Sequence, residues 1–285
     1  MRTGHSIFAA AAIALAALAG QAATAAESET PPKLKWSFAG PFGLYDEAQL
    51  QRGFKVYQEV CQNCHGLHLL AFRNLADPGG PGFSKAQATT IAAQYQVTDG
   101  PNDQGEMFQR PGRLADYIPP PFPNEQAARV RYNAVPPDFS TLAKARGVER
   151  GFPWFILDMF TQYQEGGVDY IAGYVNGYED NPPAGFALPP GAYYNKYFPG
   201  HATSMPKPLV DGQVEYTDGT PAKIDQYTKD VTAFLMWVAE PQMKARLADT
   251  GGEMLTGSPA EFRKLLAGEI EKWAKVVKAS GTKPD

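Results

Sequence analysis

The amino-acid sequence predicts a mainly helical protein with long irregular loops. Two segments, 46–65 and 225–247, place apolar residues at spacings of three and four, which is typical of amphipathic helices. Between Asp77 and Pro221 the chain concentrates its prolines and glycines, of which it has 25 and 28, in runs such as YIPPPFPNE and NPPAGFALPPGAYYN. We therefore expect helices near both ends of the chain and loops between them that pack on a large apolar group.

The N-terminal segment, residues 1–26, is typical of a bacterial signal peptide. Arg2 gives a positive start, Ile7–Leu18 form a short apolar run, and Ala23 and Ala25 offer a cleavage site. A buried alanine-rich helix is the alternative, but the order of charge, apolar run and small residues fits export better. The sequence thus predicts that the mature chain works in a periplasm, where thiols tend to be oxidised.

Length and charge limit the classes of function. After removal of the leader, about 260 residues remain, enough for one large or two ordinary domains. The formal net charge of the whole chain is −4. This mildly acidic balance argues against a nucleic-acid partner and is compatible with a basic protein partner.

The first predicted helix begins after Asp46, a suitable N-cap residue. Its apolar face also takes in the cysteines, since Leu50, Phe54, Tyr57, Cys61 and Cys64 follow the same spacing. We therefore expect the helix to extend through the two cysteines.

Two more helices are expected further along the chain. One begins at Pro153, in PWFILDMFTQY, because proline is favoured in the first turn. The other begins at Asp225, and Pro241 is expected to bend or end it. Its apolar face consists of Tyr227, Val231, Phe234, Leu235 and Val238.

Both cysteines and two of the four histidines lie in the ten residues EVCQNCHGLH, 59–68. On a helix, Cys61, Cys64 and His65 would project from nearly one face. The CxxCH spacing is the attachment signature of c-type haem. Two thiols can add to the two vinyl groups on one porphyrin edge, and the adjacent imidazole can reach the iron.

Three other kinds of site are alternatives to haem attachment in this segment. A disulfide oxidoreductase would need CxxC after a strand in a βαβ unit, whereas the preceding residues are helix-patterned. A zinc site of Cys61, Cys64, His65 and His68 would be strained, as would a disulfide across two residues. We therefore favour haem attachment and interpret His68 as a hydrogen-bonding loop residue.

A haem electron carrier needs a second axial ligand, and methionine raises its potential. Met205, in HATSMPKPLVDG, is the preferred candidate because Pro206 and Pro208 stiffen its loop. Met107 and His201 remain the competitors. The other methionines after the leader are interpreted as core (Met159, Met236) or as lying in polar surroundings near the chain end (Met243, Met254).

Several long segments resemble the cytochrome c1 family, the haem subunits of cytochrome bc1 complexes, in its proteobacterial form. The resemblance begins at WSFAGPFGLYDEAQLQRGFKVYQEVCQNCHGLHLLAFRNLA and continues through YNAVPPDFSTLAKAR and GGVDYIAGYVNGY. It ends with GAYYNKYFPGHATSMPKPLVDGQVEYTDGTPA and DQYTKDVTAFLMWVAEPQMKAR, so that it covers roughly residues 34–247 in order.

The resemblance implies one covalently bound haem c and a set of site residues. Cys61 and Cys64 would form the thioethers, and His65 and Met205 would bind the iron. Pro137 would pack near the haem, and Arg146 and Tyr170 would lie at its propionates, where a guanidinium suits bidentate pairing. The family fold is a class I cytochrome c core, in which the helix bearing the haem motif crosses the C-terminal helix; Gly53 would fit that close contact.

The resemblance also implies a role. The protein would take one electron from the Rieske iron–sulfur protein and pass it to a cytochrome c, in complex with cytochrome b, on the periplasmic side of the bacterial inner membrane. No catalytic acid or base is implied, because no bond is made or broken. A free periplasmic class I cytochrome c is the alternative, and a solute-binding protein is a more distant one.

The expected organisation is a leader at 1–26, a haem domain at 27–250 and an amphipathic C-terminal helix at 251–285. The family ordinarily ends in a membrane-spanning helix, whereas the longest late apolar run here, VTAFLMWVA, is nine residues. The tail resembles instead the C-terminus of periplasmic solute-binding receptors, and a capping box at Ser258 opens it. We expect it to replace the anchor, with membrane association through partner subunits.

Acidic residues recur in the loops that the family places near the haem edge. As a set they are expected to steer a basic cytochrome c towards the protein. The set consists of Glu179, Asp180, Asp211, Glu215 and Asp218.

Overall fold

The computed structural model describes residues 28–39, 43–147 and 166–249, with side chains up to Glu240 in the last range, and the single positions Gly268, Lys272 and Lys275. The expected leader at 1–26, the expected helix from Pro153 and most of the tail lie outside the described residues. The chain divides into two compact units, Met1–Ala239 and Glu240–Asp285. Every site residue predicted from the sequence belongs to the first unit.

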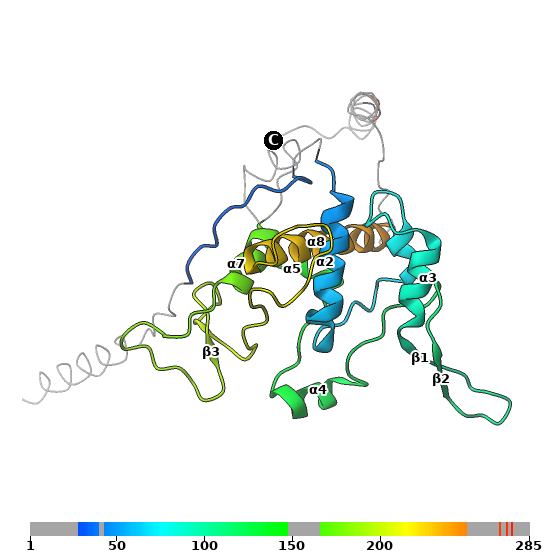
Figure 1. Ribbon diagram of the computed structural model, residues 1–285, viewed down its shortest axis with the longest axis horizontal. Helices are drawn as coiled ribbons and strands as arrows, with labels where there is room; N and C mark the ends of the chain where they lie inside the picture. The colour runs from blue at the N-terminus through cyan, green and yellow to red at the C-terminus, as the bar shows by residue number, and fades with distance from the viewer. Residues whose placement is uncertain are drawn as a thin grey trace, which may run out of the picture. The chain divides into compact units, whose positions relative to one another are not determined.

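Helices dominate the described structure, which confirms the mainly helical prediction (Figure 1). Two pairs of short antiparallel strands, β1 with β2 and β3 with β4, are the strands of the described ranges. In chain order the elements are α2 (Glu47–Glu59), the 3-10 helices η1 (Cys61–Asn63) and η2 (Phe72–Ala76), α3 (Lys85–Ala93), β1 (Gln96–Asp99), β2 (Phe108–Pro111), α4 (Glu125–Tyr132), α5 (Leu142–Ala145), α7 (Gly167–Asn176), β3 (Tyr193–Tyr194), β4 (Ala202–Thr203) and α8 (Ile224–Asp249).

The predicted start of α2 is confirmed at atomic detail. The Asp46 side chain accepts a hydrogen bond from the backbone N–H of Gln49 at 2.7 Å, which satisfies one of the free donors of the first turn. The apolar positions Leu50, Phe54 and Tyr57 are buried, as their spacing predicts.

Helices α2 and α8 cross at Gly53 (Figure 1). A Cβ atom at this position would lie 2.1 Å from the carbonyl oxygen of Asp230 and 2.7 Å from the Cβ of Phe234. Only glycine allows the two backbones to approach this closely. The expectation that Gly53 lies at a close helix contact is therefore confirmed.

Aromatic packing and one ion pair hold the crossing together. Phe54 meets Phe234 edge-to-face, with ring centroids 5.6 Å apart. Beside them Arg52 Nε donates to the fully buried carboxylate of Asp230 at 2.9 Å, and its NH1 donates to Asp218 at 2.8 Å. A buried carboxylate requires such a partner, so this network fixes how the helices pair.

One predicted helix end is wrong. Helix α2 stops at Glu59, and Val60 leaves helical geometry, so Cys61 and Cys64 do not continue its apolar face. Pro241 was expected to bend or end the last helix, and α8 does not end there, because it runs past Pro241 to Asp249. Proline removes a single backbone hydrogen bond from a helix interior, and here the helix continues in spite of this loss.

Within the ranges that the structure describes, no helix combines the length and the apolar character needed to cross a membrane.

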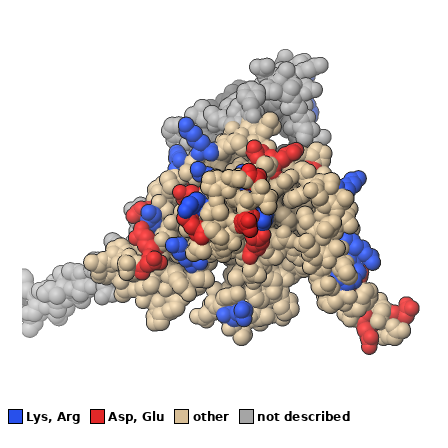
Figure 2. Space-filling view, in the orientation of Figure 1, with Lys and Arg blue, Asp and Glu red and all other residues tan. Residues whose placement is uncertain are grey.

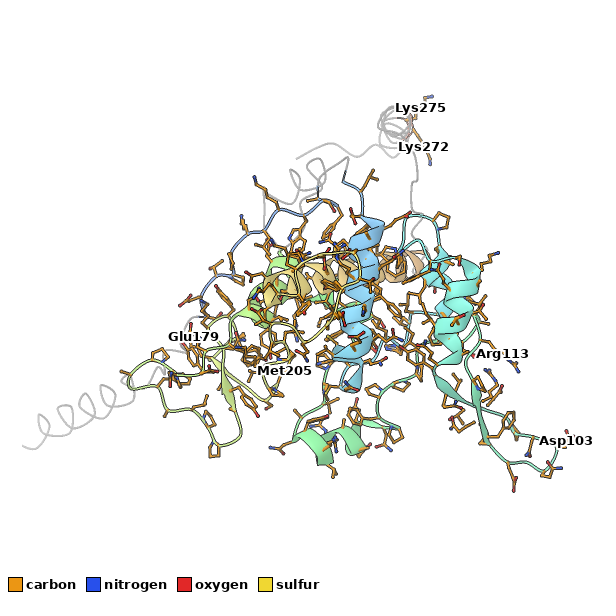
Figure 3. All side chains as sticks on the ribbon, viewed as in Figure 1. Asp103, Arg113, Glu179, Met205, Lys272 and Lys275 are labelled. Carbon is orange, nitrogen blue, oxygen red and sulfur yellow. The ribbon has the colours of Figure 1, made fainter. Side chains whose placement is uncertain are left out.

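The hairpin of β1 and β2 projects from the rest of its unit (Figure 1). At its base Arg110 bonds the carboxylates of Asp99 and Asp116. Asp103 lies at its tip (Figure 3).

Candidate functional site

The two cysteines lie in a tight turn that follows α2. The N–H groups of Cys64 and His65 both bond the carbonyl of Cys61, at 3.1 and 2.9 Å, and this closes η1. Both cysteines are half-buried free thiols. Burial, with a contribution from the Cys64 thiol, raises the pKa of Cys61 to about 12. Cys64 Sγ lies 3.4 Å from the hydroxyl of Tyr132.

His65 is buried, with 6% of its surface exposed, and is held in one tautomer. Its Nδ1 lies 2.8 Å from the carbonyl oxygen of Pro137. A carbonyl can only accept, so the proton must be on Nδ1 and the lone pair on Nε2. Burial also lowers the pKa of His65, although the Pro137 bond and Asp138 act in the opposite direction. The result is a neutral imidazole whose Nε2 can bind a metal.

The segment after Pro137 holds the His65 turn in place. The Phe139 ring stacks on the imidazole, with centroids 4.1 Å apart and planes at 18°, and its N–H donates to the Gly66 carbonyl at 2.8 Å. Ser140 Oγ accepts from the backbone of Leu69 at 3.1 Å. These contacts join residues about 70 positions apart and place the imidazole against the core.

His68 is a hydrogen-bonding loop residue, as predicted. Its backbone N–H and its Nδ1 bond the Asp138 carboxylate at 3.1 and 2.9 Å. Burial acts to raise the pKa of Asp138, but hydrogen bonds from Ser140 and His68 outweigh it and hold the pKa below its ordinary value. Among the described residues, no three or more His, Cys, Asp or Glu side chains converge as a metal site.

Met205 lies in the loop after β4, and its backbone bonds Tyr178, which follows α7, and Thr203 on β4. The Tyr178 hydroxyl donates to the Met205 carbonyl at 3.0 Å. The Met205 N–H donates to Thr203 Oγ1 at 3.3 Å, and Thr203 Oγ1 in turn lies 2.6 Å from the hydroxyl of Tyr174. In the view of Figure 3, Met205 lies towards the end of α2 that leads into Cys61.

The competing distal candidates are placed differently. Met107 adjoins β2 on the projecting hairpin and is 60% exposed. His201 has a positive φ of 58°, its ring stacks on Tyr194, and its Nδ1 lies 3.3 Å from the Asn195 carbonyl. Met236 is buried in the core, as predicted. This placement favours Met205 over Met107. The structure does not describe the side chains of Met159, Met243 and Met254.

Arg146 and Tyr170, which the resemblance groups at the haem propionates, do lie together. Arg146 is the exposed C-cap of α5, and Tyr170 is half-buried on α7. A Cβ on Gly167 would lie 2.0 Å from the Ala143 carbonyl, so glycine permits the close packing of these two helices. Burial raises the pKa of Tyr170, and the nearby Arg146 charge opposes part of that rise.

Most of the predicted acidic set is ion-paired. Asp211 pairs with Lys223 at 2.9 Å, Asp218 with Arg52 at 2.8 Å, and Glu179 with Lys196 at 3.7 Å. Figure 2 accordingly shows acidic and basic side chains interspersed over this face of the molecule. These five carboxylates therefore attract a basic partner less strongly than five unpaired carboxylates would.

Sequence reasoning missed five residues that shape the site. Asp138 and Phe139 belong to the PPDFS motif, and their polar and aromatic character next to Pro137 was an available signal. Tyr174 and Tyr178 repeat the spacing of Tyr170, four residues apart; Tyr170 and Tyr174 share one face of α7, and Tyr178 follows two residues after the helix ends. Nothing local marks Tyr132 as a neighbour of Cys64.

The donor set fits a covalently attached haem. Two reduced thiols occupy one turn, a neutral imidazole with a free Nε2 follows them directly, and a thioether lies on a separate ordered loop. Thiols, an imidazole and a thioether match the attachment and axial ligands of c-type haem.

Comparison with known proteins points the same way. A model of the Cytochrome C1 family matches residues 36–273. The match thus extends past residue 247, where the resemblance ended, and covers part of the tail whose sequence resembles periplasmic solute-binding receptors.

Curated relatives carry names from the same family. A protein named "Cytochrome b/c1" from Bradyrhizobium diazoefficiens is 62% identical over 77% of this chain, but the chain spans only 32% of that longer protein. "Cytochrome c1" of Blastochloris viridis is 52% identical, with 81% of this chain and 82% of the relative covered. The mitochondrial cytochrome c1 haem protein of Saccharomyces cerevisiae is 45% identical, over 80% of this chain and 68% of the relative.

Proposed function

The chain belongs to the cytochrome c1 family, and we propose from this that it is the haem-bearing electron carrier of a cytochrome bc1 complex. It would take one electron from the Rieske iron–sulfur protein and pass it to a cytochrome c. The observation that carries the proposal is the turn Cys61–His65 with its free thiols and its single-tautomer imidazole.

Each residue of the site has a defined task. Cys61 and Cys64 would add across the two vinyl groups, sulfur to one carbon and hydrogen to the other. His65 Nε2 and Met205 Sδ would bind the iron, and Arg146 with Tyr170 would neutralise and orient the propionates. When bound, haem c supplies a one-electron iron couple. Burial of His65 against Phe139 excludes water from the imidazole side.

The class I cytochrome c fold is part of the proposal. The crossing of α2 and α8 at Gly53 supports it, because α2 leads directly into the thiols and α8 is the long late helix. We also propose the periplasmic side of the inner membrane as the location, on the basis of the leader-like segment 1–26, with cytochrome b as the membrane partner.

A free class I cytochrome c is not favoured. The family match runs through the loops between the haem motif and the last helix, as well as through the haem motif itself.

The test is to purify a tagged chain from detergent-solubilised membranes of a strain that supports haem attachment. We expect one haem c per chain by pyridine haemochrome, together with cytochrome b and the Rieske protein in a quinol:cytochrome c reductase. A haem-bearing chain recovered quantitatively without cytochrome b would contradict the complex. A chain without haem would contradict the proposal altogether.

A further inference from the structure

The loop that carries Met205 is fastened through the backbone of Met205 itself. The carbonyl of Met205 accepts from the Tyr178 hydroxyl at 3.0 Å, and its N–H donates to Thr203 Oγ1 at 3.3 Å. Thr203 Oγ1 is in turn 2.6 Å from the Tyr174 hydroxyl. Tyr178, two residues past the end of α7, therefore holds the carbonyl side of Met205, and Tyr174 on α7 supports its N–H side through Thr203.

Apolar packing fixes the loop only weakly. Met205 is half-buried, and the residues on either side of it, Ser204 and Pro206, are exposed. The core cluster is not continuous through these positions and resumes at Leu209. Because burial is slight here, hydrogen bonds must do more of the work of fixing the loop than they do in the core.

The donor, in contrast, adjoins a rigid support. Tyr178 lies two residues past Asn176, the last residue of α7, and Val168, Ile171 and Ala172 bury one face of this helix. At its end the buried Asn195 donates from Nδ2 to the Tyr174 carbonyl at 2.7 Å, and Tyr178 pairs with Asn195 in an isolated bridge. The Tyr178 backbone cannot shift without breaking these contacts.

The ring of Tyr178 is held as well. It meets the ring of Tyr174 edge-to-face, with centroids 5.7 Å apart. This ring contact and the bridge to Asn195 together limit the movement of the Tyr178 hydroxyl.

We propose that Tyr178 is a positioning residue for the distal methionine: its hydroxyl fixes the Met205 backbone, and this backbone holds the Met205 sulfur at the iron. The inference rests on the proposed function, since it takes Met205 as the ligand. Tyr178 itself does not touch the iron. Its effect on the haem potential passes through the geometry and the order of the loop.

The consequence of losing the hydroxyl is a looser sulfur ligand. A neutral hydrogen bond shifts an equilibrium by up to about tenfold. Methionine ligation favours reduced iron and so raises the midpoint potential. If the missing hydroxyl weakens this ligation tenfold, the midpoint potential falls by about 59 mV for one electron. We take this value as the upper bound on the fall.

The test compares Tyr178→Phe with Tyr197→Phe in the haem-loaded protein. Both substitutions remove one hydroxyl from a half-buried tyrosine of the same region, and the Tyr197 ring packs beside Lys196 rather than on the Met205 loop. For Tyr178→Phe we expect a lower midpoint potential, loss of the weak sulfur-to-iron absorption band at a pH about one unit lower, and about tenfold greater binding of carbon monoxide to the reduced protein. For Tyr197→Phe we expect none of these changes.

Met205→Leu, measured in parallel, separates two failures. If the sulfur-to-iron band survives in Met205→Leu, Met205 is not the ligand, and the positioning role falls with it. If Met205→Leu removes the band but Tyr178→Phe behaves like Tyr197→Phe in all three measurements, the ligand stands and the role of Tyr178 is wrong. Should Tyr178→Phe yield too little protein, Tyr174→Phe measured in the same three ways must show the same direction of change.

Discussion

The two sides of the candidate haem site are built on different principles. On the His65 side, which we define as residues 61–68 with 137–140, the ligand is buried, stacked on Phe139 and bonded to the Pro137 carbonyl. On the Met205 side, residues 203–208 with Tyr174 and Tyr178, the ligand is half-buried and its backbone is held by hydroxyl groups. Changes on the first side should therefore damage attachment and folding, whereas changes on the second should alter the iron and leave the fold intact.

The largest effect is expected on the His65 side. Changing Cys61 and Cys64 together to Ala removes both sulfur nucleophiles, so covalent haem should be lost completely. Haem staining on a denaturing gel and the pyridine haemochrome spectrum measure this. Covalent haem at the normal level in the double variant would refute the attachment site.

On the Met205 side, Met205→Leu should lower the midpoint potential by on the order of 0.1 V or more, within the roughly 0.8 V that axial ligands span. Thermal unfolding should change little, because the side chain is only half-buried. Met107→Leu is the matched control, and neither its potential nor its sulfur-to-iron band should change. A normal potential in Met205→Leu would point to another distal ligand.

The support of the His65 side can be weakened at the helix crossing. Gly53→Ala places a Cβ within 2.1 Å of the Asp230 carbonyl, so overpacking should cost about 1–3 kcal/mol of unfolding free energy in urea titrations. In a helix without this contact, alanine would be more stable than glycine by about 1 kcal/mol. A net loss of unfolding free energy in Gly53→Ala can therefore be assigned to the close contact with Asp230. Ala48→Val, at an exposed position of the same helix, should cost less than about 1 kcal/mol. Equal stability of Gly53→Ala and the parent protein would contradict the close crossing.

A smaller effect should appear in the pH dependence of the His65 side. The pKa of Asp138 is held below its ordinary value in the folded protein. Its contribution to stability is therefore complete above the unfolded pKa of about 3.9 and is lost as the pH falls through the folded pKa. Asp138→Asn should lower the unfolding free energy at pH 7 by about 1 kcal/mol, because hydrogen bonds to a charged acceptor contribute about 1.5–3 kcal/mol and those to a neutral amide oxygen about 0.5–1.5 kcal/mol.

The same substitution should also flatten the fall in stability between about pH 5 and pH 2. Urea titrations at several pH values measure both effects. If the unfolding free energy of Asp138→Asn falls with pH as steeply as that of the parent protein, other carboxylates control the acid unfolding.

The smallest effect concerns partner binding on the Met205 side. Three of the five predicted steering acids are ion-paired, so electron transfer to a basic cytochrome c should slow by only about two- to five-fold over a tenfold rise in ionic strength. Stopped-flow reduction of the acceptor measures this rate. A salt-independent rate would leave these carboxylates without a steering role.

The same contrast explains what the sequence could predict. On the His65 side, the attachment residues are adjacent in sequence, and the helix before them follows a regular apolar spacing. The start of α2 at Asp46 and the burial of Leu50, Phe54 and Tyr57 were therefore predictable. The end of α2 was not, because apolar spacing continues through Cys61 and Cys64 although the backbone has already left the helix.

The contacts that complete the site join distant segments. Pro137 and Phe139 reach His65 across about 70 residues, and Tyr178 reaches Met205 across 27. No local propensity encodes such pairs. The resemblance to a known family supplied Pro137, Arg146 and Tyr170, whereas the contacts of Asp138, Phe139 and Tyr178 became visible only in the folded chain.

The crossing at Gly53 also constrains the order in which the chain can fold. Arg52 and Asp230, which meet there, are 178 positions apart, so their contact closes a very long loop and forms late. The Cys61–His65 turn needs only bonds within five residues and can form early. During synthesis, which proceeds from the N-terminus, both sulfur atoms are thus present before α8 is made. We expect haem attachment to have its widest access in this interval, before α2 and α8 cross.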